Sequence, residues 1–311
     1  MNDTTNDILL LSIGVITLMA ALTLAGEYLR GRLPIGETNP VVETFMQRVN
    51  SWWAIVTLLA IAALLGEVAL LLLFAFASFA ALREFLTLSS KRRADHLSLA
   101  LGFFAILPLQ YLFVGLGWTG LFAVFIPVYA FLLLPIVSAL RGDSSRFLVR
   151  VAETQWALMI CIFCISHIPA LLTFELAGDR SILLILFVVM VVQFGDLIEY
   201  YAGRRIGRRR IAPGLSPKTI EGMICGVLGA AIIGGLLAWI TPFGLIGAAG
   251  MAALASVTGM FGSLVFAAIK RDKGVKDWSH LIPGQGGFLD QLDSVIFAAP
   301  VFYHVSHLIW A

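Results

Sequence analysis

Long apolar stretches, separated by short polar loops, constrain this chain more than any other feature. Eight have the length of one membrane span, and a ninth, 52–86, is too long for one. A helical span needs about 20 apolar residues, and lipid leaves the backbone only helices or closed barrels. With 59% hydrophobic and 13% charged residues, the sequence predicts an all-α, polytopic membrane helical bundle. The eight stretches lie near 8–26, 97–117, 119–140, 154–175, 181–203, 219–240, 243–269 and 294–310.

Loop charge decides how the 52–86 stretch crosses the membrane. Positively charged loops stay in the cytoplasm, and both loops flanking 52–86 are rich in Lys and Arg. The stretch must therefore cross an even number of times, so we expect a hairpin that turns near Gly66 and Glu67. Because the two arms of this hairpin are short, the alternative is a pair of re-entrant segments that do not cross the membrane fully. The prediction is one integral membrane domain over 1–311, with about ten spans (eight to ten), both termini outside and the catalytic loops cytoplasmic.

Three other features favour structural interpretations. The N-terminus, MNDTTND, is acidic, which argues against a cleaved signal peptide. The Cys161-x-x-Cys164 pair lies in an apolar stretch without a partner pair, which favours buried small residues over a zinc site. His167, beside Pro169, is interpreted as a hydrogen-bonded core histidine. No nucleic-acid partner is expected.

The segment 270–293, KRDKGVKDWSHLIPGQGGFLDQLD, combines acids, basic residues and a Pro-Gly-x-Gly-Gly turn between two apolar stretches. Carboxylates offer the hard oxygen ligands that suit Mg²⁺, basic side chains can contact phosphates, and glycine lets backbone N–H groups approach a ligand. A merely solvated charged loop does not account for the glycines. The segment therefore predicts a phosphate–metal site. Its acids are Asp277, Asp290 and Asp293, and its phosphate contacts are Lys270, Arg271 and Lys276.

Two earlier blocks add polar groups to this site. Asp196 and Glu199 lie one turn apart within an apolar stretch, where acids are functional by default; the alternative is an acid paired with an arginine of the next loop. The block 216–222 reads Ser-Pro-Lys-Thr-Ile-Glu-Gly and predicts a helix start with Ser216 as its N-cap. The N-terminus of a helix beside a lysine and two hydroxyls is a suitable phosphate cradle. Its candidate residues are Ser216, Lys218 and Thr219.

These motifs resemble those of the CDP-diacylglycerol synthases, or phosphatidate cytidylyltransferases. The similarity lies in K-R-x4-K-D, P-G-x-G-G and D-x-x-D after residue 269, and in D-x-x-x-Y-x-x-G-R and S-P-K-T-x-E-G before it. It covers roughly residues 190–300, the signature-bearing catalytic region, whereas the spans of 1–150 match only in being multi-span. The chain is identified as a divergent member of that family.

The resemblance implies that the phosphate of phosphatidate attacks the α-phosphorus of CTP, giving CDP-diacylglycerol and pyrophosphate. It also implies Mg²⁺, with a second cation as an option, a homodimer in the bilayer of the bacterial inner (plasma) membrane, and a cytoplasmic active site. Metal-site residues are then Asp290, Asp293, Asp277 and Asp196. Catalytic residues are Lys270, Arg271, Lys276, Asp277 and Gln285, and substrate contacts are Lys218, Ser216, Thr219, Arg204, Gly284, Gly286 and Gly287.

Three positions depart from the family pattern. Gln285 stands where the family has a histidine, Gln291 where it has an arginine, and Ser263 where many bacterial members have an aspartate. A phosphate nucleophile is already ionised at neutral pH, so positioning and charge neutralisation can still support transfer. The departures keep two alternatives open: a CTP-dependent lipid or polyprenol kinase or other CDP-lipid synthase, and a non-catalytic lipid-binding paralogue.

Overall fold

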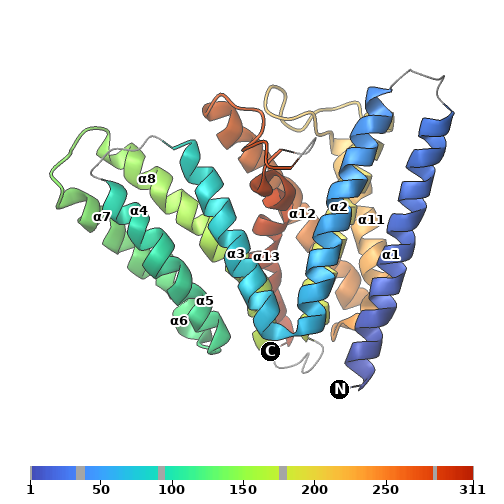
Figure 1. The fold of residues 1–311 in the computed structure, drawn as a ribbon, viewed down its shortest axis with the longest axis horizontal. Helices are drawn as coiled ribbons and strands as arrows, with labels where there is room; N and C mark the ends of the chain where they lie inside the picture. The colour runs from blue at the N-terminus through green and yellow to red at the C-terminus, as the bar shows by residue number, and fades with distance from the viewer. Residues whose placement is uncertain (1, 33–38, 90–94, 175–180, 283–285, 311) are drawn as a thin grey trace.

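The computed structural model describes residues 2–32, 39–89, 95–174, 181–282 and 286–310. Within these ranges the chain is helical, and β-pairing is confined to isolated bridges between Arg210 and Thr219 and between Ile282 and Gly286. Figure 1 shows α4–α7 on one flank and α1 on the other, with α13 between them. The predicted all-α membrane bundle is confirmed.

The N-terminal part consists of three long helices, α1 (Asn2–Gly31), α2 (Pro40–Leu65) and α3 (Glu67–Thr87). Gly66 separates α2 from α3 with a φ of 99°, a conformation that glycine adopts without a steric cost. The predicted hairpin at Gly66 and Glu67 is confirmed. Its arms contain 26 and 21 residues, so each arm is long enough to cross a bilayer.

The middle of the chain forms three further spans, each with a π-helical turn inside it. Pro108 follows the first such turn and Pro127 lies inside the second, and a proline removes a backbone donor from the helical ladder. His167 is fully buried and its Nδ1 lies 2.7 Å from the Phe163 carbonyl oxygen, as expected of a core histidine. The segments are α4 (His96–Leu101), η2 (Gly102–Ile106) and α5 (Leu107–Gly115); α6 (Thr119–Val124), η3 (Phe125–Ala130) and α7 (Phe131–Ala139); and α8 (Phe147–Leu158), η4 (Met159–Cys164), α9 (Ile165–Ala170) and η5 (Leu171–Thr173).

The C-terminal helices carry the polar motifs. They are α10 (Ser181–Ile206), α11 (Ile220–Leu236), α12 (Gly244–Asp272) and α13 (Phe288–Trp310), with a short η7 (Ala238–Ile240) before α12. Nine helical segments of the described chain are long and apolar enough to cross a membrane, and α11 is a shorter apolar helix. Both chain ends lie at one end of the bundle, and the connections after α10 and α12 lie at the other (Figure 1). Which end faces the cytoplasm stays a prediction.

Glycines bring α10, α11 and α12 into close contact. A Cβ atom at Gly226 would lie 2.7 Å from the Gly195 carbonyl oxygen, and one at Gly222 would lie 2.8 Å from the Glu199 carbonyl oxygen. On the next interface, a Cβ atom at Gly234 would lie 2.3 Å from the Cβ of Ala252. Small residues permit such backbone approach between membrane helices. Gly222, Gly226 and Gly234 are therefore packing positions.

We predict that Gly226→Ala lowers the free energy of unfolding by about 1–3 kcal/mol, because the added methyl group overpacks the α10–α11 contact. Thermal unfolding of the purified protein in detergent measures the change. Gly250→Ala on α12 is the matched control, since that position has open space around it. It should be neutral or stabilise by up to about 1 kcal/mol; equal effects of the two substitutions would contradict the packing argument.

Candidate functional site

A polar cavity of about 260 Å³ lies between α2, α10, α12 and α13 beside the loop that precedes α11. Acids of two motifs that are far apart in the sequence meet there, together with one lysine. Most of the lining comes from the last turns of α10 and the first turns of α13. The lining residues are Trp52, Gln193, Asp196, Leu197, Glu199, Tyr200, Lys218, Ser263, Asp290, Gln291, Asp293 and Ser294.

Lys218 joins the two acids of α10. Its Nζ lies 3.5 Å from Asp196 Oδ1 and 3.1 Å from Glu199 Oε2. The sequence-based alternative expected an arginine as partner, so the structure corrects the partner to Lys218. Burial disfavours the ammonium form, but the carboxylates of Asp196, Glu199 and Asp293 outweigh it and raise the pKa of Lys218 above its ordinary value. Lys218 therefore stays positively charged at neutral pH.

The N-cap of α11 is Thr219, and the prediction of Ser216 was wrong. Thr219 Oγ1 accepts a hydrogen bond of 3.2 Å from the Gly222 N–H, and α11 begins at Ile220. The helix starts late because the preceding backbone is held extended, with a bridge between Arg210 and Thr219 and a bond from the Ile220 N–H to the Arg209 carbonyl oxygen. Ser216 instead accepts a hydrogen bond from the Lys218 N–H at 3.3 Å.

Asp290 holds the loop between α12 and α13 in place. Its Oδ1 accepts a hydrogen bond of 2.7 Å from Lys270, and its Oδ2 accepts bonds from the Trp278 N–H at 2.9 Å and the Gly287 N–H at 2.8 Å. The side chain is only 8% exposed. Sequence reasoning assigned Asp290 to metal binding alone and missed this structural role. Its substitution would therefore disturb the loop as well as any ligand.

Glu84 of α3 is a second carboxylate that holds this loop, and sequence reasoning missed it. It accepts hydrogen bonds from the Phe288 N–H at 2.8 Å, the Leu289 N–H at 2.9 Å and the Ser279 hydroxyl at 2.5 Å. A Cβ atom at Gly287 would lie 2.7 Å from the Glu84 carboxylate, which explains the second glycine of the Gly-Gly pair. The signal was present, because Glu84 is an acid at the end of an apolar stretch.

Asp293 and Ser263 face the same cavity from α13 and α12. Asp293 Oδ1 accepts a hydrogen bond of 2.7 Å from the Ser294 N–H, and the Ser263 hydroxyl donates to the Met260 carbonyl oxygen at 2.9 Å. Asp293 thus joins Asp196 and Glu199 of α10 at the cavity wall. The metal site itself stays a prediction.

Other predicted residues lie outside the cavity lining. Arg271 and Lys276 are exposed, Asp277 is half-buried beside Gly286, and the exposed Arg204 donates a hydrogen bond of 2.8 Å to the Tyr200 hydroxyl. Gly286 has a φ of 86°, and a Cβ atom there would lie 2.5 Å from Asp290 Oδ2. Gly284 and Gln285 fall outside the described residues.

The chemistry of the cavity suits a hard divalent cation. Asp196, Asp293 and Glu199 supply carboxylate oxygens around one space, although the described residues contain no ready-made group of three or more metal-binding side chains. Mg²⁺ does not need one, since it is usually held by one or two carboxylates together with substrate phosphates. The donor set therefore fits the ion that the predicted chemistry requires.

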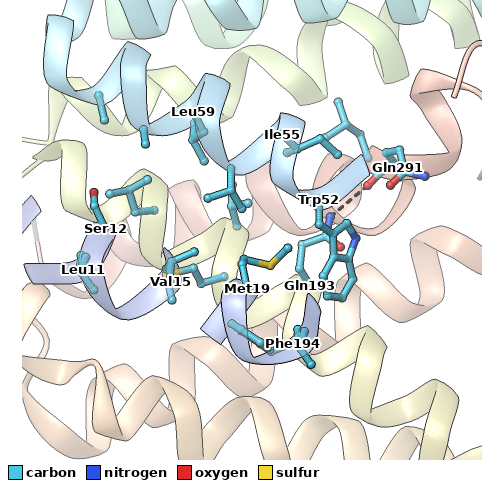
Figure 2. Close-up of a pocket in the computed structure, with 18 residues that line it drawn as sticks. Leu11, Ser12, Val15, Met19, Trp52, Ile55, Leu59, Gln193, Phe194 and Gln291 are labelled. Carbon is cyan, nitrogen blue, oxygen red and sulfur yellow. Dashed lines mark hydrogen bonds between the residues drawn. The ribbon is translucent and has the colours of Figure 1, made fainter. Parts of the chain in front are cut away.

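An apolar pocket of about 150 Å³ adjoins the polar cavity, between α1, α2, α10 and α13. The two spaces share Trp52, Gln193 and Gln291. Figure 2 shows these three residues together at one end of the pocket and Leu11 at the other. Gln193 Nε2 donates to the Gln291 backbone carbonyl oxygen at 3.0 Å, which links α10 to α13 at the junction. Sequence reasoning assigned neither Trp52 nor Gln193 to the site.

The fold and the site together define a polytopic membrane protein with a charged cavity at one end of its bundle. The profile of the cytidylyltransferase family matches residues 46–309. The chain belongs to the cytidylyltransferase family and is a nucleotidyltransferase.

Similar curated proteins support this assignment. The uncharacterized protein YnbB of Escherichia coli (strain K12) is 36% identical over 293 residues, which cover 92% of this chain and 94% of that protein. The phosphatidate cytidylyltransferase of Synechocystis sp. is 40% identical over 111 residues, or 35% of this chain and 38% of that protein. That of Thermotoga maritima is 34% identical over 173 residues, or 52% and 62%. The chain thus spans less than two thirds of the length of these two enzymes.

We predict that Glu84→Ala loosens the start of α13, because it leaves the Phe288 and Leu289 N–H groups without an acceptor. Hydrogen exchange of these two amides should become at least about fivefold faster, since an unsatisfied buried donor costs about 1–3 kcal/mol. Glu67→Ala, at the exposed start of the same helix, should leave their exchange unchanged. Unchanged exchange in Glu84→Ala would show that this carboxylate does not hold the loop.

Proposed function

We propose that the protein is a phosphatidate cytidylyltransferase of phospholipid biosynthesis, which uses CTP and Mg²⁺. The observation that supports this most is the junction of two unlike spaces. A cavity with four carboxylates and a lysine adjoins an apolar pocket, and the two share Trp52, Gln193 and Gln291. A phospholipid has the same division into a charged head group and apolar chains. The names of the Synechocystis and Thermotoga relatives support the same reaction.

The proposed reaction is one displacement at phosphorus. A phosphate oxygen of phosphatidate attacks the α-phosphorus of CTP and forms a new phosphorus–oxygen bond. The bond between the α-phosphorus and the oxygen that bridges it to the β-phosphate breaks. Pyrophosphate leaves with the electron pair of that bond. The attacking phosphate is already ionised, so the chain has to position the substrates and neutralise charge rather than remove a proton. A glutamine at position 285 is compatible with that requirement.

Lys218 is the cationic group of the cavity lining and would contact a phosphate of either substrate. Asp293 and Asp196 would hold the Mg²⁺ ion, which supplies neutralisation of the triphosphate when bound. Asp290 would keep the loop closed over them through its bonds to Trp278 and Gly287. The exposed Arg271 and Lys276 would attract anionic substrates toward the site.

The proposal includes an orientation. We place the polar end of the bundle in the cytoplasm of the bacterial inner membrane, because CTP is there and the positively charged loops favour that side. Phosphatidate would enter sideways from the bilayer, since its acyl chains leave lipid only at a high cost. The homodimer implied by the family resemblance stays a prediction.

We predict that Lys218→Gln lowers kcat/KM by about 10²–10³-fold, the effect of removing one preorganised charge-stabilising donor. The assay uses purified protein in mixed micelles with labelled CTP, phosphatidate and Mg²⁺, and measures CDP-diacylglycerol and pyrophosphate. Arg205→Gln is the control, because Arg205 is exposed and does not line the cavity. Equal activity of the two variants would contradict the role of Lys218.

We predict that EDTA and Asp293→Asn each abolish product formation, because both remove the cation from the phosphates. Asp293 is a sharper test than Asp290, since Asp290 also holds the loop. Calorimetric titration with Mg²⁺ and CTP measures whether the variant loses the ion. Wild-type protein that binds Mg²⁺ and CTP without using phosphatidate would indicate another lipid acceptor. Wild-type protein without CTP binding would overturn the proposed enzyme in favour of a non-catalytic role.

A further inference from the structure

The apolar pocket follows the helices away from the charged cavity toward the middle of the bundle. On α10, pocket-lining Leu186 and Val189 precede Gln193, and Gln193 precedes the cavity acids Asp196 and Glu199. On α2, which runs in the opposite direction, Trp52 comes first and the apolar lining residues follow it. Figure 2 shows the same order, with Trp52, Gln193 and Gln291 at one end of the pocket. The charged side chains therefore lie on one side of the junction, and the other side is apolar except for Ser12.

One wall of this pocket comes from α1, which lies outside the region matched by the family profile. Its inward face repeats at helical spacing, with Leu11, Val15, Met19 and Leu22 lining the pocket. At 1.5 Å per residue, the face from residue 11 to 22 is about 16 Å long. The pocket thus extends along α1, a helix long and apolar enough to cross a membrane.

Two contacts fix this wall near the junction. Trp53 Nε1 donates a hydrogen bond of 3.0 Å to Thr23 Oγ1, and a Cβ atom at Gly26 would lie 3.1 Å from the Phe45 ring. Helix α1 therefore packs closely on α2, while the pocket lies between its inward face and α10. Met19, an unbranched and adaptable side chain, lines the pocket near the junction (Figure 2).

We infer that this pocket binds one acyl chain of the lipid phosphate substrate and that the α1 wall determines which chain lengths are accepted. The inference rests on the proposed function and names the part of the substrate that α1 recognises. The occupant follows from continuity: the head-group phosphate in the charged cavity would place the attached chain at Trp52, and the pocket beyond it is lined by apolar side chains except for Ser12.

Val15→Phe tests this inference, because Val15 lies about 10 Å along α1 from Leu22. A short acyl chain that starts at the junction does not have to reach Val15. We expect the ratio of kcat/KM for dipalmitoyl over dioctanoyl phosphatidate to fall about tenfold, the scale of discrimination in an apolar pocket. Ile16→Phe is the matched control, since Ile16 is 48% exposed on the outward side of the same helix. It should leave the ratio unchanged; an equal change in both variants, or none in Val15→Phe, would overturn the inference.

A second measurement separates this inference from the proposed reaction. Phosphatidate with a diazirine at the end of one acyl chain is photolysed in vesicles with the wild-type protein, and the labelled residues are mapped by mass spectrometry. The acyl site is supported, even without turnover, if Leu11 or Val15 is labelled. Excess unlabelled phosphatidate should remove this labelling, and Val15→Phe should reduce it. Labelling confined to outward residues such as Ile13 and Ile16 overturns it, whereas turnover without the chain-length effect would leave the proposed reaction intact.

Discussion

The close approach of α10, α11 and α12 is the contact on which the rest of this structure depends. Lipid provides little hydrophobic drive between helices, so packing and polar contacts have to hold them together. Gly222 and Gly226 let α11 touch the backbone of α10 at Glu199 and Gly195. That contact sets the start of α11 beside the last turns of α10, and Lys218 thereby reaches both Asp196 and Glu199.

Buried carboxylates perform two different tasks in the resulting site. Asp290 and Glu84 accept backbone N–H groups and so fix the loop and the start of α13. Asp196, Glu199 and Asp293 line the open cavity, where Lys218 balances only part of their charge. An excess of carboxylate around a cavity favours a divalent cation arriving with nucleotide phosphates.

The position of the cavity matters as much as its residues. It lies at the end of the bundle, yet Trp52, Gln193 and Gln291 connect it to an apolar pocket between α1, α2, α10 and α13. In the proposed reaction, the nucleotide would stay in water and the lipid chains in the bilayer. That would avoid the cost of moving a charged group into lipid. This arrangement is the physical basis of the proposed transfer between a soluble and a membrane substrate.

The sequence by itself determined the class of fold and the hairpin at Gly66, because span length and backbone freedom are local properties. It also singled out Asp196, Glu199, Asp290 and Asp293, which line one cavity in the structure. It placed the cap of α11 at Ser216 instead of Thr219, because it did not foresee that the pairing with Arg209 and Arg210 holds the preceding backbone extended. It missed Glu84 because the amides that Glu84 binds are 204 and 205 residues away in the chain. Only the tertiary structure decided that Asp290 holds a loop and that α1 borders a pocket beside the cavity. Those roles follow from which helices meet, and no local pattern specifies that.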